Sequence, residues 1–109
     1  YKIPVKCIIL NNGKLGMVRQ FQKVFLSSRY ASTNLDADVD FCLVAKGFGV
    51  HGIKVKNLAE LKEGLKKAMA IPGPVVLDVA IHPDTYSFPM VPPGKDSTAM
   101  IFDADEWEG

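Results

Sequence analysis

The chain has 109 residues, a length typical of one compact domain, and 48% of them are hydrophobic, which is enough to build a core. Thirteen basic and twelve acidic residues leave a net charge of +1, and their interspersed order predicts no basic surface for nucleic acid. No apolar run reaches the length needed to cross a membrane. We therefore expect a small domain that binds neither nucleic acid nor a membrane.

The two cysteines, Cys7 and Cys42, lie in apolar stretches and lack the spacing of a zinc site or a CxxC motif. Each is expected to be a buried, reduced thiol, as in a cytoplasmic protein. His51 and His82 stand apart from any candidate nucleophile. These residues therefore predict no zinc site and favour a structural role for both thiols.

The first element is a near-continuous apolar run from Val5 to Leu10, which is typical of a parallel strand buried on both faces. The residues that follow, 11–13, read Asn-Asn-Gly and favour a turn. A helical spacing of apolar residues then begins at Leu15 or Gly16. Its predicted apolar face consists of Met17, Val18, Phe21, Val24 and Phe25. The opposite face is predicted to carry Arg19, Gln20, Gln22 and Lys23.

A polar loop over residues 28–38 leads to three elements. Asp38 or Asp40 is placed to cap a second helix over residues 41–48. Apolar and other residues alternate over residues 50–55, which predicts the second strand. Asn57, with Glu three residues later, is typical of the start of a third helix.

The third strand covers residues 74–81 and is apolar apart from Asp78, which we interpret as either a functional carboxylate or a hydrogen-bonded structural one. Helices between strands imply parallel pairing through right-handed crossovers. The prediction is an α/β fold, a three-layer parallel sheet with flanking helices. Because three strands make a small sheet, we expect it to be incomplete and continued upstream. Residues 1–81 would form the α/β part, and residues 82–109 a proline-rich C-terminal tail.

The turn after the first strand is the candidate site. Ligands of α/β proteins bind at the carboxyl edge of the sheet, and a helix start offers N–H groups to a phosphate. Asn and Gly also form turns without any ligand, and from spacing alone that simpler interpretation is preferred.

The run from Leu10 to Phe21, Leu-Asn-Asn-Gly-Lys-Leu-Gly-Met-Val-Arg-Gln-Phe, resembles the thiamine-diphosphate enzymes, and more narrowly the large catalytic subunits of acetolactate synthases. Residues 86–95 are similar to the Pro-Met-x-Pro-x-Gly segment near the C-terminus of that family. Residues 44–49 and 73–79 match two weaker runs between them. The resemblance covers nearly the whole chain in the expected order.

The resemblance implies roles for five residues. Asn12 would give its side-chain oxygen to Mg²⁺, and Lys14 its backbone carbonyl. Gly16 and Met17 would lie against the cofactor, thiamine diphosphate. Phe21 stands where the family usually carries Trp in the pocket for the second substrate, so the preference between pyruvate and 2-oxobutyrate stays open.

The resemblance also implies what lies outside this sequence. The Gly-Asp-Gly half of the metal motif, the cofactor-activating glutamate and the FAD-binding domain have no counterpart here, so no catalytic residue is assigned and the piece alone is expected to be inactive. The implied partners are the rest of the catalytic subunit, a second copy in a homodimer or tetramer, and a regulatory small subunit. The implied pathway is branched-chain amino acid biosynthesis, and the tail would close over the active site.

Two other interpretations stay open. The chain could be a stand-alone α/β module that binds a phosphate at the helix start or serves only assembly. It could also be part of another thiamine-diphosphate decarboxylase or carboligase.

Overall fold

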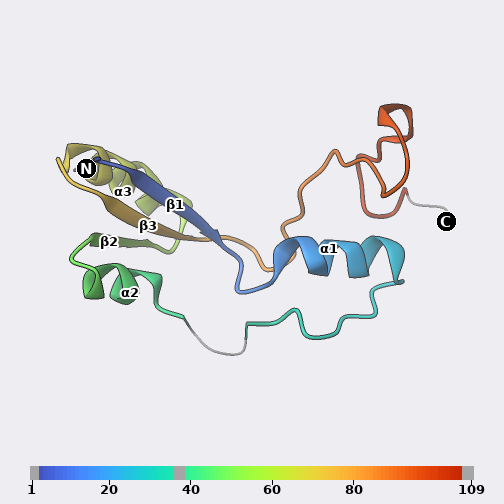
Figure 1. Cartoon of the computed structure of the whole chain (residues 1–109), viewed down its shortest axis with the longest axis horizontal. Helices are drawn as coiled ribbons and strands as arrows, with labels where there is room; N and C mark the ends of the chain where they lie inside the picture. Colours follow the sequence, from blue (N-terminus) through green and yellow to red (C-terminus); the bar gives the residue numbers. More distant parts are fainter. Residues whose placement is uncertain (1–2, 36–38, 107–109) are drawn as a thin grey trace. The chain divides into compact units, whose positions relative to one another are not determined.

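The computed structural model describes residues 3–35 and 39–106. Within them the elements are β1 (Lys6–Asn11), α1 (Gly16–Phe25), α2 (Phe41–Gly47), β2 (His51–Val55), α3 (Leu58–Ala70), β3 (Val75–Ala80) and a short 3-10 helix, η1 (Ser97–Ala99) (Figure 1). The order of helices and strands is the one that the sequence predicts. The chain divides into two compact units, which we call unit 1 (residues 1–12 and 37–83) and unit 2 (residues 13–36 and 84–109).

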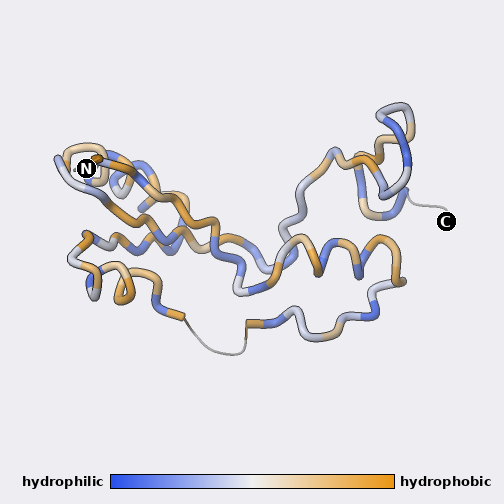
Figure 2. The backbone as a smooth tube through the Cα atoms, in the orientation of Figure 1, coloured by the Kyte–Doolittle hydropathy of each residue, from blue (hydrophilic) through white to orange (hydrophobic). Residues whose placement is uncertain are grey.

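Unit 1 contains a parallel sheet of three strands in the order β1-β3-β2. The central strand, β3, pairs with β1 from Lys6–Val75 to Asn11–Ala80 and with β2 from His51–Val75 to Val55–Val79. The predicted parallel pairing is therefore confirmed. Most of β1 and β3 is coloured as hydrophobic in Figure 2, as expected for strands of this kind.

One face of the sheet packs against α3 and the other against α2. On the α3 face, Leu77 is 1% exposed and forms a core with Val55 and Val79. Gly64 of α3 lies so close to β2 that an added Cβ would be 2.7 Å from Val55 Cγ2. On the other face, a Cβ on Gly52 would lie 2.7 Å from the Cα of Cys42 in α2. Gly52 and Val55 point to opposite faces because side chains alternate along a strand. The three-layer arrangement is thus confirmed.

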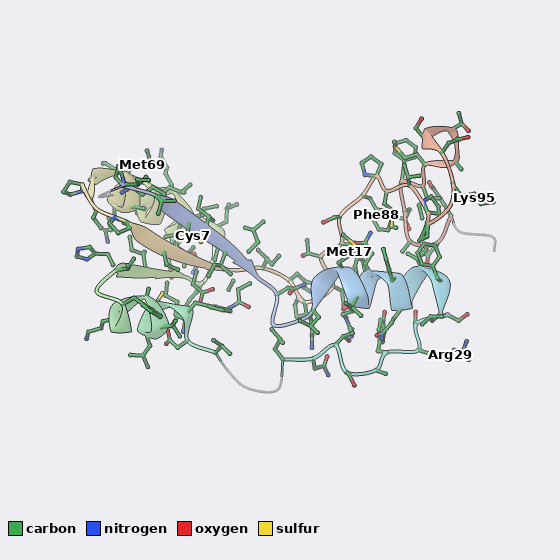
Figure 3. The ribbon with its side chains drawn as sticks, in the orientation of Figure 1. Cys7, Met17, Arg29, Met69, Phe88 and Lys95 are labelled. Atoms are coloured by element: carbon green, nitrogen blue, oxygen red, sulfur yellow. The ribbon has the colours of Figure 1, made fainter. Side chains whose placement is uncertain are left out.

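The strand β1 is less buried than its sequence predicts. Leu10 is 66% exposed, and Ile8 is also exposed. The helices α2 and α3 pack on β2 and β3, so β1 is an edge strand that neither helix covers. Cys7, on β1 (Figure 3), is consequently exposed, and Cys42 is half-buried. The prediction of two buried thiols is therefore wrong, although both cysteines are free as expected.

The predicted caps begin two helices of unit 1. Asp40 Oδ1 accepts from Leu43 N at 2.9 Å, and this bond, together with Lys54 Nζ at 3.1 Å from Oδ2, lowers the pKa of Asp40. The alternative cap, Asp38, lies outside the described residues. At α3, Asn57 Oδ1 accepts from Glu60 N at 3.0 Å. Each cap satisfies a backbone N–H that has no partner inside its helix.

Unit 2 consists of α1, the segment that follows it, and the described C-terminal segment, residues 84–106. The C-terminal segment closes on itself, because Met90 and Ile101 exchange two backbone hydrogen bonds of 2.9 Å. Ile101 and Pro92 are buried there. The residues 107–109 at the end of the predicted tail lie outside the described ones. No helix in the described part of the chain is long and apolar enough to span a bilayer.

The core of unit 1 predicts a strong contrast between two leucines. Replacement of the buried Leu77 by Ala leaves a cavity in the centre of the sheet and should reduce the free energy of unfolding by about 2–5 kcal/mol. Leu58 on α3 is 82% exposed, so Leu58→Ala should change it by less than about 0.5 kcal/mol. Urea denaturation of both variants measures the difference. Equal losses would contradict the core described above.

Candidate functional site

Within unit 1, two hydrogen bonds hold the end of β1 to β3 and to the residue that follows β3. Asn11 Nδ2 donates to Asp78 Oδ1 at 3.0 Å, and Asn11 O accepts from Ile81 N at 3.0 Å. Asp78 lies on the central strand and is 2% exposed. Asn12 follows directly after this anchored residue and is half-buried. Of the two interpretations of Asp78, the structure therefore supports a hydrogen-bonded carboxylate, and it places this carboxylate beside the candidate site.

In unit 2, the turn continues through Gly13 and Lys14. Gly13 has φ +66°, a left-handed conformation that glycine adopts without strain. Lys14 forms an antiparallel bridge with Asn34, flanked by backbone hydrogen bonds from Leu15 N to Thr33 O at 2.9 Å and from Leu35 N to Gly13 O at 3.1 Å. Lys14 Nζ also donates to Asn34 Oδ1 at 2.8 Å. Part of the predicted polar loop therefore braces the turn.

The helix α1 begins at Gly16 without a side-chain cap. Leu15 occupies the N-cap position, where its apolar side chain accepts no hydrogen bond, and the first turn of α1 carries no acidic residue. The positive end of the helix dipole is therefore not offset by a carboxylate of that turn. Met17, on this first turn (Figure 3), is 55% exposed, and Phe21 one turn later is 37% exposed. Both side chains present apolar surface that a ligand could contact.

The prediction that Gln20 lies on the polar side of α1 is wrong. Gln20 is 2% exposed, and its amide binds the C-terminal segment: Nε2 donates to Ser87 O at 2.9 Å, and Oε1 accepts from Ser87 N at 2.8 Å. Nε2 also contacts Met90 Sδ at 3.1 Å. The Gln20 amide thus donates to and accepts from the backbone of one residue, Ser87, as a neighbouring strand would.

A polar cluster next to Gln20 joins α1 to two other segments of unit 2. Arg19 Nη2 lies 2.9 Å from Asp84 Oδ1, and its guanidinium lies 3.8 Å from the ring centre of Tyr30. The hydroxyl of Tyr86 lies 3.4 Å from both Asp84 Oδ1 and the Tyr30 hydroxyl. Burial, followed by the bond with Tyr30, raises the pKa of Tyr86 to about 12. The hydrogen bond with Tyr86 lowers the pKa of Tyr30.

A signal for Gln20 was present in the sequence. It stands three residues after Met17 and four before Val24, so it shares the helical face of these apolar residues. A polar residue within an apolar stripe indicates a buried side chain with a specific partner. The partner itself, Ser87, is 67 residues away and no local pattern points to it.

Comparison with known proteins gives the family. Residues 1–79 match the family model described as thiamine pyrophosphate enzyme, C-terminal TPP binding domain. This match covers most of the chain. The chain belongs to this family. It shares 43% identity over 102 residues with an acetolactate synthase of Arthrospira platensis, which covers 93% of this chain and 18% of that protein.

Other relatives agree. The acetolactate synthase large subunit of Porphyra purpurea is 39% identical over 102 residues, with 93% of this chain and 17% of the relative covered. The isozyme 2 large subunit of Escherichia coli K12 is 35% identical over 100 residues, with 92% of this chain and 18% of the relative covered. The predicted resemblance to the thiamine-diphosphate enzymes and to acetolactate synthase large subunits is confirmed, and the chain spans less than a fifth of the length of these relatives.

The donor chemistry of the turn suits the metal that the family resemblance implies. An Asn side chain and a backbone carbonyl, those of Asn12 and Lys14, offer neutral oxygens, and Mg²⁺ prefers oxygen ligands. Among the described residues, no group of three or more His, Cys, Asp or Glu side chains could hold a metal ion. Asn12 belongs to unit 1, whereas Lys14, Gly16, Met17 and Phe21 belong to unit 2.

The pairing of Gln20 with Ser87 predicts a local effect on the C-terminal segment. Gln20→Leu removes both hydrogen bonds to the Ser87 backbone, so the Ser87 N–H loses its acceptor on Gln20. Exchange of the Ser87 amide hydrogen should therefore accelerate by about tenfold or more. Gln22 is the matched control, because it makes the same pair of bonds to Ala31 on the neighbouring segment. Gln22→Leu should accelerate exchange at Ala31 and leave Ser87 unchanged. Identical profiles for the two variants would refute the pairing.

The tyrosine pair predicts a stability change in alkali. The pKa of Tyr86 rises on folding from 10.0 to about 12, so its contribution to stability is complete below pH 10 and is lost as the pH rises toward 12. Phenolate absorbance of the folded protein should contain a component near pH 12 that Tyr86→Phe removes. Tyr30→Phe, the control, should remove a component that titrates earlier. A high-pH component that survives Tyr86→Phe would contradict the assignment.

Proposed function

We propose that this chain forms the C-terminal part of the cofactor-binding domain of an acetolactate synthase large subunit. The intact enzyme would condense pyruvate with a second 2-oxo acid, pyruvate or 2-oxobutyrate, with loss of carbon dioxide. The observation that carries the proposal is the segment from Asn11 to Met17. It joins an anchored strand end, a tight turn and an uncapped helix start in a chain whose relatives are acetolactate synthases.

The turn would hold the metal and the diphosphate. Asn12 would provide its side-chain oxygen and Lys14 its backbone carbonyl to Mg²⁺, which in turn binds phosphate oxygens. Gly16 would allow the diphosphate to approach the backbone at the positive end of α1, where no first-turn carboxylate repels it. The bracing of Lys14 by the Asn34 segment would keep its carbonyl in place.

Two of the exposed apolar residues of α1 would serve the organic part of the site. Met17 would lie against thiamine diphosphate and Phe21 would line the second-substrate pocket. When bound, the cofactor supplies the electron sink that lets a 2-oxo acid lose carbon dioxide and join a second one. The side chains of Met17 and Phe21 would exclude water from the reacting carbon.

The remaining features follow the family resemblance. The tail, residues 82–109, would close over the active site, and its described part is held to α1 by Gln20 and Arg19. The intact subunit would also carry FAD in another domain. It would assemble as a homodimer or tetramer with a regulatory small subunit, in the cytoplasm, and would serve branched-chain amino acid biosynthesis.

Loss of the Asn12 amide tests the metal assignment. In the complete subunit proposed here, Asn12→Ala removes a ligand oxygen and should weaken Mg²⁺ binding by about tenfold or more in the presence of thiamine diphosphate. Isothermal titration calorimetry measures the Mg²⁺ affinity, and an acetolactate assay measures turnover. Asn57→Ala, which removes the α3 cap, is the control and should leave Mg²⁺ affinity unchanged. Normal Mg²⁺ affinity and activity of Asn12→Ala would reject the assignment of Asn12 as a metal ligand.

A further inference from the structure

Asp78 is an unusual residue for its position. It lies in the central strand of a parallel sheet, among Val75, Leu77 and Val79, and is 2% exposed. A buried carboxylate destabilises a fold unless hydrogen bonds compensate its lost hydration, and an apolar residue would fill the same place without that cost. The role of Asp78 therefore follows from the residue to which its carboxylate is hydrogen-bonded.

The carboxylate holds Asn11. Asn11 Nδ2 donates to Asp78 Oδ1 at 3.0 Å, so the NH₂ group of the Asn11 amide is turned toward the carboxylate. The carbonyl of the same residue is fixed by Ile81 N at 3.0 Å. Both the side chain and the backbone of Asn11 are thus anchored to the strand β3 and the residue that follows it.

This anchor acts one residue before the proposed metal ligand. Asn11 is the last residue of β1, and Asn12 is covalently next to it. The Asn11 carbonyl and the Asn12 N–H belong to one planar peptide unit, so an anchored Asn11 restricts how Asn12 is oriented. Hydrogen bonds behind a metal ligand commonly decide its orientation and its affinity.

We propose that Asp78 is a positioning residue, which orients Asn12 toward Mg²⁺ by holding the Asn11 side chain. The inference rests on the proposed function, because it takes Asn12 as a ligand. It assigns Asp78 no contact with the metal or the substrate. The effect is transmitted through one hydrogen bond and one peptide unit.

Two substitutions at Asp78 separate the hydrogen bond from the charge. Asp78→Asn and Asp78→Leu both remove the negative charge, but only the Asn side chain retains an oxygen that can accept from Asn11 Nδ2. In the complete subunit, Asp78→Leu should weaken Mg²⁺ binding by about tenfold, whereas Asp78→Asn should stay within about threefold of the parent. Calorimetric titration with Mg²⁺ in the presence of thiamine diphosphate gives both affinities.

A second route tests the same bond from its other end. Asn11→Ala removes the donor and should weaken Mg²⁺ binding as much as Asp78→Leu does, and it serves if Asp78→Leu fails to fold. The double variant, Asn11→Ala with Asp78→Leu, should bind Mg²⁺ no more weakly than either single variant, since each substitution removes the same hydrogen bond. Asp40→Leu is the control: it removes a carboxylate that caps α2 in the same unit, and should lower the unfolding temperature without changing Mg²⁺ affinity.

The outcomes are distinct. Parent-like Mg²⁺ affinity in Asp78→Leu and Asn11→Ala, or an equal loss in Asp78→Asn and Asp78→Leu, would overturn the positioning role. Strictly additive losses in the double variant would also overturn it. If Asn12→Ala itself leaves Mg²⁺ affinity unchanged, the metal assignment in the proposed function fails, and this inference fails with it. If Asn12→Ala weakens binding and Asp78→Leu does not, only the present inference fails.

Discussion

The parallel pairing of β1 with β3 determines where β1 ends, and the candidate site begins at that end. The register carries the pairing as far as Asn11–Ala80. The last residue of β1 is then fixed because Asn11 Nδ2 donates to Asp78 and the Asn11 carbonyl accepts from Ile81 N. A strand that slipped by one residue would exchange the faces of every side chain. Asn11 would then turn away from Asp78, and Asn12 would take its place. The position of the strand end before Asn12 thus depends on the sheet register.

Unit 2 is held together differently, because side chains of α1 bind a segment that has little regular secondary structure. The C-terminal segment, residues 84–106, contains only the short helix η1, yet Gln20 binds its backbone at Ser87 and Arg19 binds its carboxylate at Asp84. These neighbouring residues belong to α1, whose first turn carries Gly16 and Met17. One short helix therefore serves both the candidate site and the segment proposed to cover it.

Much of unit 1 could be predicted from local signals. The helix caps at Asp40 and Asn57 lie where hydrogen-bonding side chains precede apolar periodicity, and the structure confirms both. The first and third strands followed from apolar runs and the second from alternating residues, and the parallel pairing followed from the helices between the strands. Helix caps and strand ends can be predicted in this way because capping and turn formation involve residues only a few positions apart.

Burial was harder to predict, for a physical reason. The apolar run in β1 indicates a strand covered on both faces, but β1 is an edge strand and Leu10 is exposed, because α2 and α3 lie over β2 and β3. Gln20 shows the opposite error: a polar residue assigned to the outer side of α1 is buried against the C-terminal segment. In both cases the packing partner, or its absence, is set by elements distant in sequence.

The sequence by itself determined the order of the elements, the α/β class, and the motif from Asn11 to Met17 by which the family can be recognised, since these depend on residue type and short-range spacing. Only the tertiary structure decided which side chains support that motif. Asp78 is 67 residues from Asn11, and Ser87 is 67 residues from Gln20. A hydrogen bond needs its donor and acceptor within about 3 Å, and only the fold brings residues so far apart in the chain to that distance.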